Sequence, residues 1–189
     1  WEKDENTLHE NEAAEILCAV CRNENMHPTD VKEGKIELVA DCDGLFRVDV
    51  PRLDAINEID EIMIATRHNN TAVKKGDRLL GTRVIPLVIA KEKLERVKEA
   101  AGSEPLVSLT PYKPMKAGIV TTGNEVYYGR IKDTFTPVII DKLAAYGIEV
   151  CGHILCDDNR EKITEAILKL KKEGADMILC TGGMSVDPD

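Results

Sequence analysis

The strongest constraint on the fold is a regular alternation of strand-like and helix-like segments in the last third of the chain. Three apolar runs have the length and composition of buried strands: 115–122, 148–155 and 176–180. Two segments of helix length separate these runs: 133–147 and 157–173. A β-α-β-α-β order is typical of a parallel sheet covered by helices on both faces. We therefore predict an α/β fold class, with a C-terminal three-layer α/β/α parallel sheet that is incomplete after its third strand.

The first hundred residues follow a different pattern, with shorter elements and alternating strands. Helical spacing is expected in three segments: 9–25, 51–62 and 90–101. Strand-like alternation is expected in 34–41 and 45–50, and short β-prone runs follow between 63 and 89. The Asp43-Gly44 pair is a turn signal that predicts a hairpin between the first two strands. These elements predict a smaller, β-rich α+β domain in front of the parallel sheet.

A segment rich in proline separates the two patterns. Residues 102–114 hold three prolines and one glycine, a composition that favours a linker. We therefore predict an accessory domain over 1–101, a linker over 102–114 and a ligand-binding domain over 115–189. Because the sequence opens at Trp1 and stops inside a loop, we expect it to be part of a longer protein.

Composition excludes several classes of protein. The 189 residues are 43% hydrophobic, enough for a real core, and their net charge of −9 argues against a nucleic-acid-binding surface. No apolar run reaches the roughly 18 residues of a transmembrane helix, so no membrane partner is expected. Of the six cysteines, only Cys18 and Cys21 have C-x-x-C spacing. The cysteines as a group predict reduced, mostly buried thiols and a cytoplasmic location. A redox or metal-binding role for Cys18 and Cys21 is the alternative.

The predicted sheet places polar and glycine residues where ligands usually bind. In open parallel sheets the ligand lies beyond the carboxyl ends of the strands, which here are 121–123, 156–158 and 181–183. Gly182 and Gly183 can leave backbone N–H groups open to an anion such as a phosphate. A plain strand-to-helix connection is the alternative for this glycine pair.

Three acidic side chains accompany these loops. Glu125 and Asp157 follow two adjacent strands of the predicted sheet, and Asp133 opens the helix between them. Carboxylates around a phosphate-sized site commonly require a divalent cation. Alternatively, Asp133 and Asp157 are helix caps worth about 1 kcal/mol each, and both roles can coexist.

Together these segments carry a resemblance to a known family. The sequence contains Thr-Thr-Gly-Asn-Glu-Val at 121–126, Gly-Arg-Ile-Lys-Asp-Thr at 129–134, Asp-Asp at 157–158 and Thr-Gly-Gly-Met-Ser at 181–185. In this order they resemble the molybdopterin-binding domain family, which includes the molybdenum-inserting transferase and the molybdopterin adenylyltransferase. The resemblance covers 115–189, about the first half of that domain. Gly-Gly-x-Ser, in place of Gly-Gly-Thr-Gly, favours the transferase branch.

The resemblance implies roles for particular residues. The implied cofactor-binding residues are Thr122, Gly123, Asp133, Thr134, Gly182, Gly183 and Ser185. Glu125 and Asp157 are the implied catalytic residues and ligands of Mg²⁺, together with a further acid beyond Asp189.

The resemblance also implies a reaction and partners. A molybdopterin molybdenumtransferase would insert molybdate into adenylated molybdopterin and release AMP. We expect turnover in the intact parent but not in this chain alone, because its sheet is unfinished. A homo-oligomer is expected, as are contacts with other cofactor-synthesis proteins or molybdoenzymes. The alternatives are a non-catalytic molybdopterin carrier or sensor, an adenylyltransferase, and a scaffold that has lost its ligand.

Overall fold

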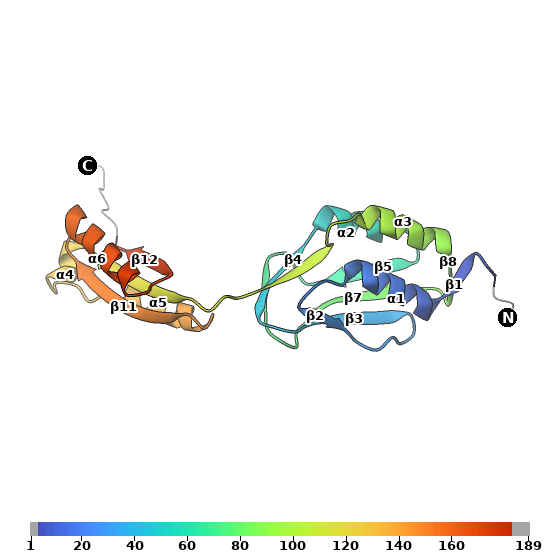
Figure 1. The fold of residues 1–189 in the computed structure, drawn as a ribbon, viewed down its shortest axis with the longest axis horizontal. Coiled ribbons are helices and arrows are strands. Elements are labelled where there is room, and N and C mark those ends of the chain that lie inside the picture. The colour runs from blue at the N-terminus through green and yellow to red at the C-terminus, as the bar shows by residue number, and fades with distance from the viewer. Residues whose placement is uncertain (1–3, 183–189) are drawn as a thin grey trace. The chain divides into compact units, whose positions relative to one another are not determined.

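The computed structural model describes residues 4–182, which divide between Tyr112 and Lys113 into two compact units (Figure 1). Each unit has its own apolar core. Over the described part of the chain, no helix combines the length and apolar character needed to cross a membrane.

The first unit is built from short antiparallel strands and three helices. Its elements are β1 (Thr7–His9), α1 (Glu10–Cys21), β2 (Met26–Pro28), β3 (Lys35–Ala40), β4 (Gly44–Val48), α2 (Val50–Asn57), β5 (Ile62–Thr66), β6 (Thr71–Val73), β7 (Arg78–Val84), β8 (Val88–Ala90), α3 (Lys91–Ala101) and β9 (Val107–Pro111). The strands form the sheets β2-β3-β7-β5 and β6-β4-β9 and the pair β1-β8. One continuous core joins these sheets to the buried faces of the helices. The expected β-rich α+β class is confirmed.

The expected hairpin at Asp43-Gly44 is wrong. β3 pairs with β2 and β7, whereas β4 pairs with β6 and β9, so the two strands belong to different sheets. A Cβ atom at Gly44 would overlap the carbonyl oxygen of Thr110 on β9. Glycine is therefore used here for the close approach of β9, and not for a two-residue turn.

The proline-rich segment contains a paired strand. Val107 and Leu109 are buried, and residues 107–111 pair antiparallel with β4 from Val48 to Gly44. The alternating apolar residues complete a sheet because their side chains enter the core of the first unit. Up to Pro111, the segment is thus part of that sheet and not a free connection. The division into domains at 1–101 and 115–189 stays a prediction.

The second unit has the expected three-layer architecture. Its elements are β10 (Lys116–Thr122), α4 (Asn124–Tyr127), α5 (Phe135–Ala144), β11 (Glu149–Cys156), α6 (Arg160–Lys172) and β12 (Met177–Thr181). The three strands are parallel in the order β11-β10-β12. The α/β fold class predicted from the segment order is confirmed.

The two long helices cover opposite faces of this sheet. Ile119 of β10 packs with Leu143 of α5, whereas its neighbour Val120 packs with Leu170 of α6. Successive side chains of a strand point to opposite faces, so one strand serves both cores. At Gly118, a Cβ atom would lie 2.9 Å from Cβ of Leu170, so glycine permits α6 to approach closely. Because all three strands are parallel, their carboxyl ends meet at one edge of the sheet.

Candidate functional site

Three loops follow β10, β11 and β12 at the carboxyl edge of the sheet, and we number them first, second and third in this order. The first and third loops are in contact. The hydroxyl of Thr122, the last residue of β10, donates a 3.2 Å hydrogen bond to the carbonyl oxygen of Thr181. Gly182 has a φ of +94°, and a Cβ atom there would overlap the carbonyl oxygen of Thr122. Gly123, with a φ of +130°, turns the chain from β10 into α4. The structure therefore brings Thr122, Gly123 and Gly182 together, while Gly183 and Ser185 lie outside the described residues.

A reciprocal backbone-to-side-chain pair joins the first and second loops. The Asn124 amide donates to Oδ2 of Asp158 at 3.2 Å, and the Asp158 amide donates to Oδ1 of Asn124 at 3.5 Å. The loop holding Glu125 therefore lies beside the loop holding Asp157. Glu125 is exposed in α4, and no hydrogen bond or ion pair joins its carboxylate to that of Asp157. The structure thus places the two acids in neighbouring segments at the same edge of the sheet.

Asp157 is mostly buried and only half satisfied. Its side chain is 14% exposed, and its Oδ2 accepts a 2.6 Å hydrogen bond from the ammonium of Lys162. Its Oδ1 is buried and has no partner that meets hydrogen-bond geometry, although the backbone amides of Asn159 and of Asp157 itself lie near enough to the carboxylate to lower its pKa. The Lys162 hydrogen bond holds the pKa of Asp157 below its usual range despite the opposing effect of burial, and it raises the pKa of Lys162. The N-cap of α6 is Asn159, whose Oδ1 accepts from two backbone amides, so α6 is capped by a different side chain.

Asp133 caps α5 with its side chain. Its Oδ1 accepts hydrogen bonds of 3.0 Å from the amides of Phe135 and Thr136, and its Oδ2 accepts from the Thr136 hydroxyl. Thr134 occupies the N-cap position but makes no side-chain cap bond. Burial would raise the pKa of Asp133, but the hydrogen bonds from Thr136 and Phe135 hold that pKa below its usual range. Capping is therefore an observed role of Asp133, and its ligand-binding role stays a prediction.

The sequence patterns did not predict a polar cluster that lies beneath the loops. The Thr121 hydroxyl lies 2.9 Å from Nε2 of His153 and 3.0 Å from the Thr136 hydroxyl, and it accepts from the Thr181 hydroxyl at 3.2 Å. Asp133 adjoins it, with Oδ2 3.8 Å from Nε2 of His153. The available signal was strand periodicity, because Thr121 continues the α5-facing positions of Ile119 and so had to be paired. The cluster links all three strand ends to the start of α5.

The cap at Asp133 leads to a pH-dependent prediction. Because the pKa of Asp133 is lowered in the folded state, its stabilising effect is present above the unfolded-state value of about 3.9 and is lost as pH falls further. Asp133→Asn keeps one acceptor oxygen for the two amides but loses the charge and the oxygen that accepts from the Thr136 hydroxyl. We expect it to lower the free energy of unfolding of the second unit by about 1 kcal/mol at pH 7, and by less near pH 3. Hydrogen exchange of the Phe135 and Thr136 amides at matched pH values measures this difference.

The exposed Asp141 on the same helix supplies the matched control. Asp141→Asn removes the same charge from α5 but none of the cap bonds, so exchange of the two amides should match the wild type. An equal effect of both substitutions, or an Asp133 effect that does not depend on pH, would show that the carboxylate is not the stabilising group.

The sequence of the second unit decides its family. Residues 118–189 match the family described as "Probable molybdopterin binding domain". This segment is a member of the molybdopterin-binding domain family. The resemblance expected from the four motifs is therefore confirmed for this part of the chain.

Curated relatives match a short stretch of this chain, over a small part of their own length. A CinA-like protein of Mycobacterium sp. (strain MCS) is 38% identical over 74 residues, which are 39% of this chain and 18% of the relative. A CinA-like protein of Mycolicibacterium vanbaalenii is 40% identical over 75 residues, again 39% of this chain and 18% of the relative. The chain thus spans less than a fifth of the length of these relatives.

Two solved structures also show similarity. The tungsten cofactor synthesizing protein MoaB from Pyrococcus furiosus is 27% identical, with a TM-score of 0.37, over 40% of this chain and 46% of its own. The molybdopterin biosynthesis moeA protein from Pyrococcus horikoshii OT3 is 14% identical, with a TM-score of 0.31, over 94% of this chain and 67% of its own.

The donor set of the molybdopterin-binding domain suits a magnesium ion shared with a substrate. Among residues 4–182, no three His, Cys, Asp or Glu side chains form a group that could hold a metal. Mg²⁺, however, is commonly bound by one or two carboxylates together with waters and substrate phosphates. The unpaired buried oxygen of Asp157 fits this mode, and the exposed Glu125 lies in the adjoining loop. The assignment of both acids as metal ligands stays a prediction.

The Cys18 and Cys21 pair belongs to the core of the first unit. Both thiols are buried on α1, and all six cysteines of the chain are free thiols. Burial, and to a lesser extent the neighbouring Cys18, raises the pKa of Cys21 to about 12. A thiol that stays protonated is a poor nucleophile and a poor metal ligand. The geometry therefore favours the structural interpretation of this pair.

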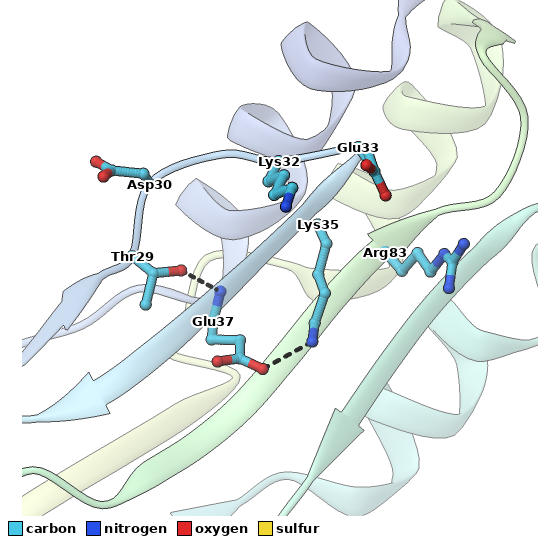
Figure 2. A pocket seen from close by; sticks show the side chains of 7 residues that line it. All are labelled: Thr29, Asp30, Lys32, Glu33, Lys35, Glu37 and Arg83. Carbon is cyan, nitrogen blue, oxygen red and sulfur yellow. Dashed lines mark hydrogen bonds and ion pairs between the residues drawn. The ribbon is translucent and has the colours of Figure 1, made fainter.

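A cavity of about 300 Å³ lies in the first unit, whereas the residues predicted to bind the cofactor belong to the second. It is lined by Thr29, Asp30, Lys32, Glu33, Lys35, Glu37 and Arg83 (Figure 2). Lys35 pairs with Glu37 at 2.8 Å, and Glu37 also pairs with Arg78 at 3.0 Å outside the cavity. Because the lining holds three basic and three acidic residues, its charges balance and favour no one class of ion.

Proposed function

We propose that the second unit binds molybdopterin at the carboxyl edge of its sheet. The observation that carries the proposal is the convergence of the family's motif residues there, with one buried carboxylate oxygen of Asp157 left without a partner. A buried ionised oxygen normally acquires a partner, so this atom is suited to a ligand or its cation.

We further propose that the intact protein inserts molybdate into adenylated molybdopterin and releases AMP. Glu125 and Asp157 would hold Mg²⁺, which as a Lewis acid would polarise the phosphate oxygens next to the bond that breaks. Thr122 and the glycines of the third loop would position the phosphates through a hydroxyl and backbone N–H groups. Asp133 and Thr134 would keep the start of α5 in place beside the ligand.

The test is AMP release from adenylated molybdopterin under anaerobic conditions. The intact protein, with Mg²⁺, should release AMP only when molybdate is present. Tight pterin binding without AMP would instead identify a carrier or sensor, and consumption of ATP with release of pyrophosphate would identify an adenylyltransferase. Absence of any binding would contradict the first proposal as well.

Glu125 provides a variant for this assay. Because its exposed carboxylate makes no structural contact in the described residues, Glu125→Ala should leave the fold intact and lower AMP release by at least about tenfold. Glu149→Ala removes an exposed acid at the opposite end of β11 and should have no effect. Wild-type turnover in Glu125→Ala would exclude the proposed role.

One observation favours the carrier or sensor as the second candidate function. Asp157 is neutralised by a lysine of its own chain, and the described residues contain no ready-made metal group. Such a site can hold a cofactor without turning it over. In the same assay, this candidate predicts saturable pterin binding that does not depend on molybdate.

We also propose that the protein forms a homo-oligomer or binds other proteins, and that it is cytoplasmic. Exposed apolar side chains on α5 and α6, among them Phe135, Val138 and Leu168, support a homo-oligomer or contacts with other cofactor-synthesis proteins or molybdoenzymes. Six free thiols support a cytoplasmic protein.

A further inference from the structure

Lys162 is positioned by the cap of α6. Asn159 accepts hydrogen bonds from the amides of Glu161 and Lys162, at 2.9 and 3.1 Å, and so fixes the first turn of the helix. From that turn the Lys162 side chain reaches back to the loop after β11, where its Nζ lies 2.6 Å from Oδ2 of Asp157. The ammonium is therefore the cation that the fold itself supplies to Asp157.

Lys162 and Asp157 differ in burial, and only one oxygen of the Asp157 carboxylate is paired. The Lys162 side chain is 53% exposed, whereas that of Asp157 is 14% exposed. The ammonium occupies one carboxylate oxygen and leaves Oδ1 buried without a partner. A buried carboxylate with a free oxygen can accept a second cation, but that cation and the ammonium would repel each other across a few ångströms. Binding of a divalent ion at Asp157 thus favours departure of Lys162.

The surroundings give Lys162 a second place to go. Its Nζ lies 5.8 Å from the centre of the ring of Tyr127, the last residue of α4. A ring face attracts an ammonium within about 6 Å, and the flexible four-carbon stem of lysine allows movement between the two loops. A displaced ammonium therefore stays near the carboxyl edge, where a phosphate ligand would meet it.

We propose that Lys162 competes with the divalent cation for Asp157, and that it pairs with the phosphate of the ligand once the cation has taken its place. The pairing of Lys162 with a ligand phosphate, which we call the ligand half of the proposal, rests on the proposed function. The competition with the cation does not rest on it. Lys162 is in this view a positioning residue: it keeps Asp157 charged and oriented before the ligand and the metal arrive together.

The competition is tested with Mn²⁺ as the probe, by electron paramagnetic resonance of the free ion. Lys162→Met keeps the length of the side chain and removes its charge, so we expect Mn²⁺ to bind roughly three- to tenfold more tightly than to the wild type. Lys162→Arg keeps the cation and should resemble the wild type. Lys169→Met, an exposed position later on α6, controls for the change in net charge. Asp157→Asn should remove the effect of Lys162→Met.

The ligand half is tested with AMP at saturating Mn²⁺, by calorimetry. AMP should bind roughly three- to tenfold more weakly to Lys162→Met, because the phosphate loses its ammonium partner. Opposite changes in Mn²⁺ and AMP affinity support the proposal. Unchanged or weaker Mn²⁺ binding, an equal change in Lys169→Met, or no Mn²⁺ binding to either protein overturns it. If Mn²⁺ binds more tightly to Lys162→Met but molybdopterin does not bind the wild type, the competition stands and the proposed function fails.

Discussion

Asp157→Asn is expected to lower molybdate-dependent AMP release by the intact protein at least about a hundredfold. The substitution keeps the shape of the side chain and removes the charge that attracts both Lys162 and the proposed cation. An asparagine amide has one acceptor oxygen and one NH₂ donor group, whereas the carboxylate has two acceptor oxygens. Either the contact with Lys162 or the unpaired Oδ1 position therefore loses its acceptor oxygen. The measurement is single-turnover AMP release at saturating Mg²⁺.

The adjacent Asp158 is the matched control for that experiment. Its Oδ2 accepts from the Asn124 amide, and an asparagine can present an oxygen to the same donor. Asp158→Asn therefore removes one charge from the same loop while the loop contact is kept, and AMP release should fall only slightly. Equal losses in both variants would indicate a general effect of charge, and wild-type turnover in Asp157→Asn would rule out its proposed part in the reaction.

Gly182→Ala is expected to have the second large effect. Its φ of +94° is unfavourable for alanine, and the added Cβ atom would overlap the carbonyl oxygen of Thr122. Strain of this kind costs about 1–3 kcal/mol before the overlap is counted. We expect the second unit to lose at least about 2 kcal/mol of unfolding free energy. Because the first and third loops would separate, we also expect molybdopterin binding to weaken at least about tenfold. Urea unfolding followed by circular dichroism and titration with molybdopterin measure the two effects.

Gly174 allows strain and overlap to be separated. Its φ of +100° is nearly the same, but no atom lies within 4 Å of the Cβ position. Gly174→Ala should therefore show the cost of backbone strain alone, about 1–3 kcal/mol, and bind molybdopterin normally. If the two variants were equally stable and bound the ligand equally, the contact between Gly182 and Thr122 would have no functional importance.

The order of the segments along the chain is sufficient to predict the architecture of the second unit and the edge of the sheet at which its loops gather. Apolar runs of strand length, separated by capped segments of helix length, can bury their faces together only as a layered parallel sheet. Parallel strands then place the loops after 122, 156 and 181 at one edge, which is why four short motifs were enough to predict the family. Local signals also predicted α3, α5 and α6 close to their observed bounds, whereas the helix expected over 51–62 ends at Asn57.

Which side chains meet could not be predicted from local patterns, because these contacts depend on packing between distant segments. The Asp43-Gly44 signal predicted a hairpin, but β3 pairs with β2 and β7, whereas β4 pairs with β6 and β9 in another sheet. The cluster around Thr121 and His153 joins residues 32 positions apart, and its members are ordinary polar residues until the sheet brings them together. The contact between Lys162 and Asp157 depends on how Asn159 starts α6. Sequence patterns fix periodicity and turns because these are local, whereas partners across a core are chosen by packing.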